Sequence, residues 1–131
     1  MIVGSYKFTG YGASVRVDAP PDIEISELRS QVAPEIAAEE SSDGPSELHL
    51  TRWNGEYHLL YGERRYGPYR TLCNALRGLS NGIHFVIGKR SPQTFLHAGA
   101  VEVDGAAVVF PGRSRWGKSR LVLSLIEQGC G

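Results

Sequence analysis

Cysteine is scarce in this sequence and long apolar runs are missing, so several classes of protein are excluded at once. Two cysteines, Cys73 and Cys130, occur among 131 residues, and they show neither metal-ligand nor redox spacing. Tyr69, Leu72 and Leu76 are helical neighbours of Cys73, which predicts a buried thiol there. The N-terminus lacks an apolar signal core, and no stretch reaches the roughly 20 apolar residues of a transmembrane helix. We therefore expect a soluble, cytoplasmic protein with no membrane partner.

Net charge is also lacking, because 14 Lys and Arg balance 14 Asp and Glu. The balance hides an asymmetry: residues 1–57 carry four basic and ten acidic side chains, whereas residues 58–131 carry ten and four. A basic C-terminal half suits a polyanionic ligand such as a nucleotide. Its basic residues form no dense run, so we expect no nucleic-acid partner. A hydrophobic content of 41% in 131 residues predicts one folded domain, or one domain and an incomplete second.

Residues 1–92 predict a β-rich N-terminal region with one or two helices. Strands are expected at residues 5–9 and 13–17, a surface loop at residues 39–45, and a short helix within residues 26–32, where the pattern is ambiguous. Apolar residues then recur at helical spacing and predict a core-facing helix that Asn81-Gly82 interrupts. They are Tyr69, Leu72, Leu76 and Leu79.

Asn54-Gly55 is a strong signal for a two-residue type I′ turn, so a β-hairpin is predicted around it. The register pairs Arg52 with Tyr57, Leu50 with Leu59, and Leu48 with Tyr61, which makes one face mainly apolar. His49 and His58 fall on the opposite face. Two histidines there are compatible with a metal site, but no third ligand is in sight, so we expect both to be solvated.

Residues 112–119 read Gly-Arg-Ser-Arg-Trp-Gly-Lys-Ser and fit the phosphate-binding loop pattern G-x-x-x-x-G-K-[ST] at every specified position. In such a loop backbone N–H groups surround a phosphate, Lys118 reaches the terminal phosphates, and the Ser119 hydroxyl can ligate Mg²⁺. An apolar run at 106–110 predicts a strand before the loop. A helix is predicted after it, with a stop at Gly129 and one apolar face made of Leu121, Val122, Leu125 and Ile126. ATP and Mg²⁺ are therefore the expected cofactors.

A second turn signal, Asp104-Gly105, pairs the segment 96–103 with the strand before the loop in antiparallel fashion. This differs from the parallel βαβ units of ordinary nucleotide-hydrolysing P-loop domains. The register places Val101 opposite Val108, Gly99 opposite Phe110, and His97 opposite Gly112. His97 is thus predicted beside the phosphate site. The alternative is a histidine merely satisfied at a strand end.

Residues 96–131, which begin Leu-His-Ala-Gly-Ala-Val-Glu-Val and continue through the loop and its helix, resemble the core of the HPr kinase/phosphorylase family and its serine-kinase relatives. That family is similar in fold to phosphoenolpyruvate carboxykinase. The resemblance implies an α/β (α+β) fold with a mixed sheet, in which residues 93–131 form the N-terminal part of a P-loop kinase core. It implies a catalytic role for His97 and a metal-ligating role for Ser119. The residues predicted to bind ATP are Gly112, Arg113, Ser114, Arg115, Trp116, Gly117, Lys118 and Ser119.

The chain departs from that family in two ways. Arg115 and Trp116 stand where the family usually has small residues, and the acidic residues that the family places just after the loop helix are missing because the chain ends at Gly131. We therefore expect a truncated core with an unpaired strand edge beside Val108, which would favour a homo-oligomer.

Three functional interpretations remain open. The first is the N-terminal portion of an HPr-kinase-like, ATP-dependent kinase that phosphorylates a serine of a protein or peptide. The alternative is a non-catalytic or degenerate nucleotide-binding module, which both departures favour. The third is a plain α/β domain without a nucleotide.

Overall fold

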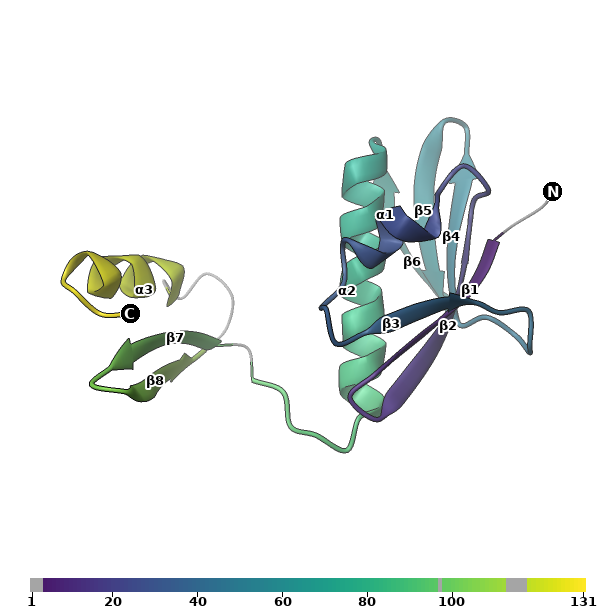
Figure 1. Cartoon of the computed structure of the whole chain (residues 1–131). Coiled ribbons are helices and arrows are strands. Elements are labelled where there is room, and N and C mark those ends of the chain that lie inside the picture. The colour runs from purple at the N-terminus through teal and green to yellow at the C-terminus, as the bar shows by residue number, and fades with distance from the viewer. Residues whose placement is uncertain (1–3, 97, 113–117) are drawn as a thin grey trace. The chain divides into compact units, whose positions relative to one another are not determined.

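The computed structural model describes residues 4–96, 98–112 and 118–131. It divides the chain into two compact units, Met1–Thr94 (unit 1) and Phe95–Gly131 (unit 2). Helices and strands are mixed, and the N-terminal region is rich in β structure (Figure 1). Among the described helices, none has the length and apolar character that a membrane crossing requires.

Unit 1 is built on a mixed six-stranded sheet in the order β3-β1-β2-β4-β5-β6. Strands β2 and β4 pair in parallel, and the other neighbours pair antiparallel. The elements are β1 (Gly4–Gly10), β2 (Ala13–Ala19), α1 (Ile25–Arg29), β3 (Ala37–Glu40), β4 (Leu48–Trp53), β5 (Glu56–Tyr61), β6 (Arg64–Tyr69) and α2 (Leu72–Arg90). The expected mixed sheet and β-rich N-terminal region are confirmed.

The core of unit 1 lies between one face of this sheet and the two helices, with α2 running along the strands (Figure 1). Side chains alternate along the strands, so every second residue of β1 and β2 points inward: Tyr6 and Phe8, then Val15, Val17 and Ala19. The opposing surface comes mainly from α2, through Ala75, Leu76, Leu79, Ile83, Val86 and Ile87. Helix α1 adds Leu28 to the same cluster.

The β4–β5 hairpin has the expected register, because Leu48 pairs with Tyr61, Leu50 with Leu59, and Arg52 with Tyr57. Asn54 and Gly55 both have positive φ, 51° and 76°, as a type I′ turn requires. The turn type sets the pairing, which explains why a dipeptide in the sequence was sufficient to predict it.

Helix α2 does not stop at Asn81-Gly82 as expected, but continues to Arg90. Beyond the interruption, Ile83, Val86 and Ile87 are each about 1% exposed. Burial of one such side chain contributes about 1.5–3 kcal/mol, which exceeds the cost of about 1 kcal/mol for a helical glycine. Tertiary packing therefore overrides the local helix-breaking signal.

Two edge strands were not predicted. The expected surface loop at residues 39–45 is wrong at its start, because Glu39 and Glu40 belong to β3, which pairs with β1. Strand β6 contains Pro68, which lowers strand propensity but is tolerated at a sheet edge where its missing N–H faces no partner strand. Neither strand carries a clear alternating pattern, so only the neighbouring strands reveal them.

The predictions for Cys73 and His58 are both wrong. Cys73 is exposed, because it is the second residue of α2, whereas the buried residues on its side of the helix, Ser80 and Ile87, lie about two and four turns further on. His58 is not solvated but 8% exposed, with its ring centroid 6.3 Å from that of Trp53. Neither of its ring nitrogens has a hydrogen-bond partner among the described residues. His49 is half-exposed and contacts Asp18, with 3.1 Å between Nδ1 and Oδ2.

Glu47 connects β2 to the end of α2. The backbone N–H of Arg16 donates to its Oε2 at 3.1 Å, and the guanidinium of Arg90 donates to its Oε1. The hydrogen bond from Arg90 is the main reason why the pKa of Glu47 is lowered from its ordinary value of 4.5. A carboxylate with a lowered pKa stabilises the folded state above its ordinary pKa and loses that contribution as pH falls through the folded-state value.

We therefore expect the melting temperature of the protein to fall as pH is lowered from about 6 to about 3, and the Glu47→Gln variant to show a shallower dependence. At neutral pH Glu47→Gln should be the less stable protein, because it loses the charge that pairs with Arg90. Circular-dichroism melts at stepped pH values measure both effects. Glu63→Gln, in an exposed turn, is the matched control. Parallel pH profiles of wild type and Glu47→Gln would contradict the assignment.

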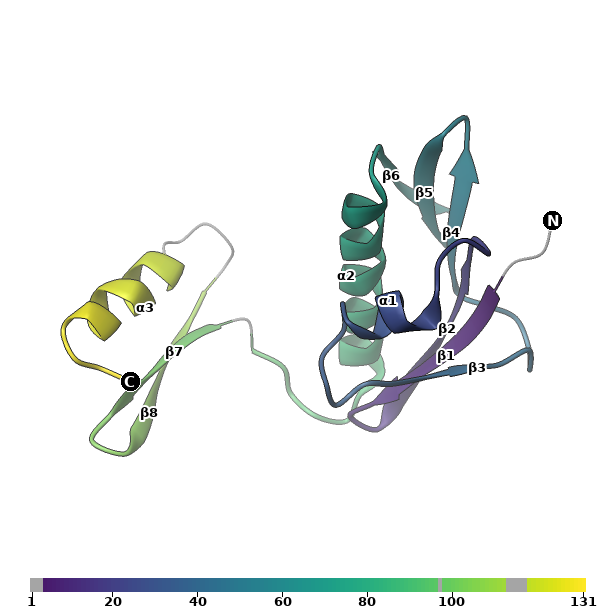
Figure 2. The ribbon, with the colours of Figure 1, turned by 45° about the horizontal axis from the view of Figure 1, so that its top comes forward.

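Unit 2 consists of a hairpin and one helix: β7 (Ala98–Val103), β8 (Ala106–Pro111) and α3 (Lys118–Glu127). Val101 pairs with Val108 and Gly99 with Phe110, so the expected antiparallel register is confirmed. Helix α3 lies along the hairpin and contacts β7 (Figure 2).

The residues that follow α3 cap the helix and return to the hairpin. Helix α3 ends at Glu127, and Gly129 provides the expected stop: the φ of Gly129 is 102°, and Cys130 N–H donates to the carbonyl of Leu125 at 3.0 Å, the pattern of a Schellman cap. The backbone of Gly131 then exchanges two hydrogen bonds with Glu102 of β7, at 2.7 and 3.1 Å. The chain therefore returns to the strand that precedes the loop strand.

Candidate nucleotide-binding site

The phosphate-binding motif lies between a strand and a helix. Strand β8 ends at Pro111, directly before Gly112, and α3 begins at Lys118. Of the predicted site residues, Gly112, Lys118 and Ser119 are described, and their elements are those that the motif requires. The other five predicted cofactor-binding residues lie outside the described residues: Arg113, Ser114, Arg115, Trp116 and Gly117.

The two ends of the motif are connected by a hydrogen bond from Lys118 Nζ to the carbonyl oxygen of Gly112, at 2.7 Å. The lysine side chain therefore turns back toward the end of β8 rather than extending along α3. In a phosphate-binding loop the lysine charge must lie at the same side as the loop backbone to reach the terminal phosphates. The Gly112 carbonyl oxygen, 2.7 Å from Nζ, belongs to the first residue of the motif.

Gly99 of β7 determines how closely α3 approaches the hairpin, a role that was not predicted. A Cβ atom at this position would lie 2.8 Å from Val122 Cγ2 and 3.5 Å from the carbonyl oxygen of Lys118. Real Cβ contacts are almost never as short as the first distance, so the first turn of α3 rests on the bare backbone of β7. A glycine inside a strand pattern is the sequence signal for such an approach.

The first turn of α3 is basic and has no acidic residue. Lys118 and Arg120 stand at the helix end where the macrodipole is already positive, an arrangement that costs about 0.3–1 kcal/mol for each charge at low salt. An anion at this position would reverse the sign of the interaction, because it would meet the positive end of the dipole and both cations together. The electrostatics therefore favour a phosphate group over a neutral ligand. The Ser119 residue in the same turn is exposed.

His97, the predicted catalytic residue, lies outside the described residues. Ala98 paired with Pro111 is the described pair nearest to it, and this pair agrees with the register that the prediction used. The predicted pairing of His97 with Gly112 remains a prediction.

Within unit 2, the described carboxylates lie away from the motif. Asp104 occupies the hairpin turn with a φ of 51°, and Glu102 pairs with Ala107 near the same turn. Both positions are at the opposite end of the hairpin from Pro111. Glu127 is the last residue of α3, roughly 13 Å from its first at 1.5 Å per residue. Within the described parts of the chain, no three His, Cys, Asp or Glu side chains are grouped closely enough to hold a metal ion.

Comparisons with family models, with curated proteins and with solved structures found no match for this chain.

Proposed function

We propose that unit 2 binds ATP with Mg²⁺ through residues 112–119. The proposal rests on one observation above all: a complete phosphate-binding motif stands between β8 and α3, and Lys118 Nζ lies within hydrogen-bond distance of Gly112. The first turn of α3, which carries Lys118 and Arg120 and no acidic residue, supports the same ligand. Ser119 would supply the protein's oxygen ligand to Mg²⁺, and the nucleotide phosphates would supply others.

The family resemblance extends this proposal to an HPr-kinase-like serine kinase with a P-loop core related to phosphoenolpyruvate carboxykinase. In that reaction the γ-phosphoryl group passes from ATP to a serine hydroxyl of a protein or peptide while a base accepts the hydroxyl proton. His97 is the candidate for that base, or for a phosphate contact. The rival function is a module that binds ATP without using it, and the sparse carboxylates near the motif favour it.

Binding and turnover separate the two functions. Phosphoryl transfer depends on metal ions held in part by carboxylates, and Glu102, Asp104 and Glu127 all stand far from the motif. We therefore expect the 131-residue chain to bind ATP but to release little ADP or phosphopeptide. The measurement is a radiolabelled-ATP assay with a serine peptide, run beside calorimetric binding of ATP on the same sample. Rapid peptide phosphorylation that disappears in Lys118→Ala would show that the required carboxylates are already present.

A further inference from the structure

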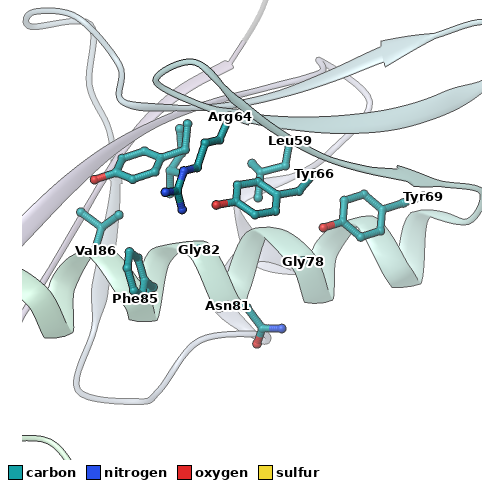
Figure 3. A pocket seen from close by; sticks show the side chains of 11 residues that line it. Leu59, Arg64, Tyr66, Tyr69, Gly78, Asn81, Gly82, Phe85 and Val86 are labelled. Carbon is teal, nitrogen blue, oxygen red and sulfur yellow. The ribbon is translucent and has the colours of Figure 1, made fainter.

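A pocket of about 460 Å³ lies in unit 1 between α2 and the strands β4, β5 and β6 (Figure 3). This size lies within the range of roughly 300–1,000 Å³ that is usual for small-molecule sites. Its floor consists of core side chains: Leu48, Leu59 and Val86 are at most 3% exposed. Its rim is open, because Tyr66 is 42% and Phe85 is 61% exposed.

Two glycines of α2 create the space. Gly78 and Gly82 are four residues apart, so both lie on the helix face toward the pocket. At Gly78 a Cβ atom would lie 2.5 Å from the Tyr69 hydroxyl, and glycine is needed to admit that ring. At Gly82 a Cβ atom would make only ordinary contacts, 3.4 Å to Leu59 and 3.5 Å to Leu48. Alanine would fit there and form a better helix, so packing within the protein does not explain the glycine.

Several polar side chains that line this apolar space form no hydrogen bond or ion pair with another described residue. Figure 3 shows the Arg64 guanidinium and the Tyr66 hydroxyl both directed at the space beside Gly82. Neither group makes an ion pair or hydrogen bond with another described residue, and the same holds for the hydroxyls of Tyr61 and Tyr69. Arg64 is the one charged side chain of the lining, which contains no Asp or Glu.

We propose that this pocket binds a small organic anion, with a flat apolar body on the Leu48–Leu59–Val86 floor and a carboxylate held by Arg64. A guanidinium matches a carboxylate in charge and in its paired donors, and the tyrosine hydroxyls add further donors at the rim. The apolar body of the ligand would fill the open space above Gly82. Its anionic group would pair with Arg64, which has no acidic partner among the described residues. All the residues that line the site belong to unit 1.

The test is a titration of the full ¹⁵N-labelled chain with 2-naphthoate, followed by NMR. The amide signals of Gly78 and Gly82 report on the pocket, and that of Gly55, in the exposed β4–β5 turn, serves as the reference. We expect saturable shifts of the two α2 glycines and little change at Gly55. Absence of a shift at Gly78 and Gly82 would overturn the proposal.

Arg64→Gln and Arg65→Gln form a matched pair of variants. The two residues are adjacent in β6 and both exposed, but side chains alternate along a strand, so Arg65 points to the other face of the sheet. Arg64→Gln should weaken 2-naphthoate binding about tenfold, and Arg65→Gln should leave it within about twofold of wild type. The neutral probe 2-naphthalenemethanol should bind more weakly than 2-naphthoate to wild type and equally to both variants. Equal affinities of the two probes, or of the two variants for 2-naphthoate, would overturn the assignment of an anion site.

Discussion

The Lys118→Ala variant should lose most of its affinity for ATP with Mg²⁺, by about 10- to 100-fold. The lysine charge is the element of the motif that reaches the terminal phosphates, and a hydrogen bond to a charged group contributes about 1.5–3 kcal/mol. Nζ lies 2.7 Å from the carbonyl oxygen of Gly112, the first residue of the motif. Isothermal titration calorimetry on wild type and variant measures the difference directly.

Lys89→Ala is the control for this experiment, because Lys89 is an exposed lysine in the last turn of α2, in unit 1. It should bind ATP as wild type does. AMP should bind more weakly than ATP to wild type and should discriminate little between wild type and Lys118→Ala, since it lacks the terminal phosphates. Equal ATP affinity in wild type and Lys118→Ala would remove the phosphate role of the lysine, and with it the main support for the proposed function.

Substitution of Gly99 by valine should reduce ATP affinity by about tenfold or more, although Gly99 lies outside the motif. A Cβ atom at this position would lie 2.8 Å from Val122, and the two further methyl groups of valine would increase the overlap. Overpacking of this kind typically costs about 1–3 kcal/mol. The strain can be relieved by moving the first turn of α3 away from β7, which would displace Lys118, and binding sites tolerate displacements of only about 0.5 Å.

Ala100→Val is the matched control, because Ala100 is the next residue of β7 and its exposed side chain points to the opposite face of the hairpin. It should retain wild-type affinity. Thermal melts with and without ATP distinguish misplacement of α3 from loss of the fold, because a folded but impaired Gly99→Val should keep its melting transition and lose the shift that ATP produces. Undiminished ATP affinity in Gly99→Val would mean that the approach of α3 to β7 does not position the lysine.

Local patterns were reliable wherever the decisive interactions lie within a few residues. The registers of the two hairpins follow from Asn54-Gly55 and Asp104-Gly105, because a two-residue turn sets the pairing of its own strands. The stop of α3 just before Gly129 follows from the same kind of reasoning, since few residues other than glycine accept a φ of 102°. The motif at residues 112–119 is likewise a local pattern, and its flanking strand and helix were expected from adjacent apolar runs.

Local reasoning failed where partners far along the chain decide the outcome. Asn81-Gly82 ends a helix in isolation, but the sheet offers apolar contacts to Ile83, and α2 continues. Strand β6 exists because β5 pairs with it, whatever the local preference of Pro68. The burial of His58 beside Trp53 depends on two strands together, so a pattern on one strand could not predict it.

The sequence by itself determined the candidate ligand, because a phosphate-binding motif is defined by residue types at short spacing whose backbone groups act locally. Only the tertiary structure decided how that motif is supported and what else the chain contains. Gly99 packs against α3, and Gly78 and Gly82 lie opposite β4, β5 and β6, through contacts between residues 9 to 34 positions apart in the chain. Such contacts arise from the packing of one element on another, and packing depends on shapes and distances that residue types alone do not specify.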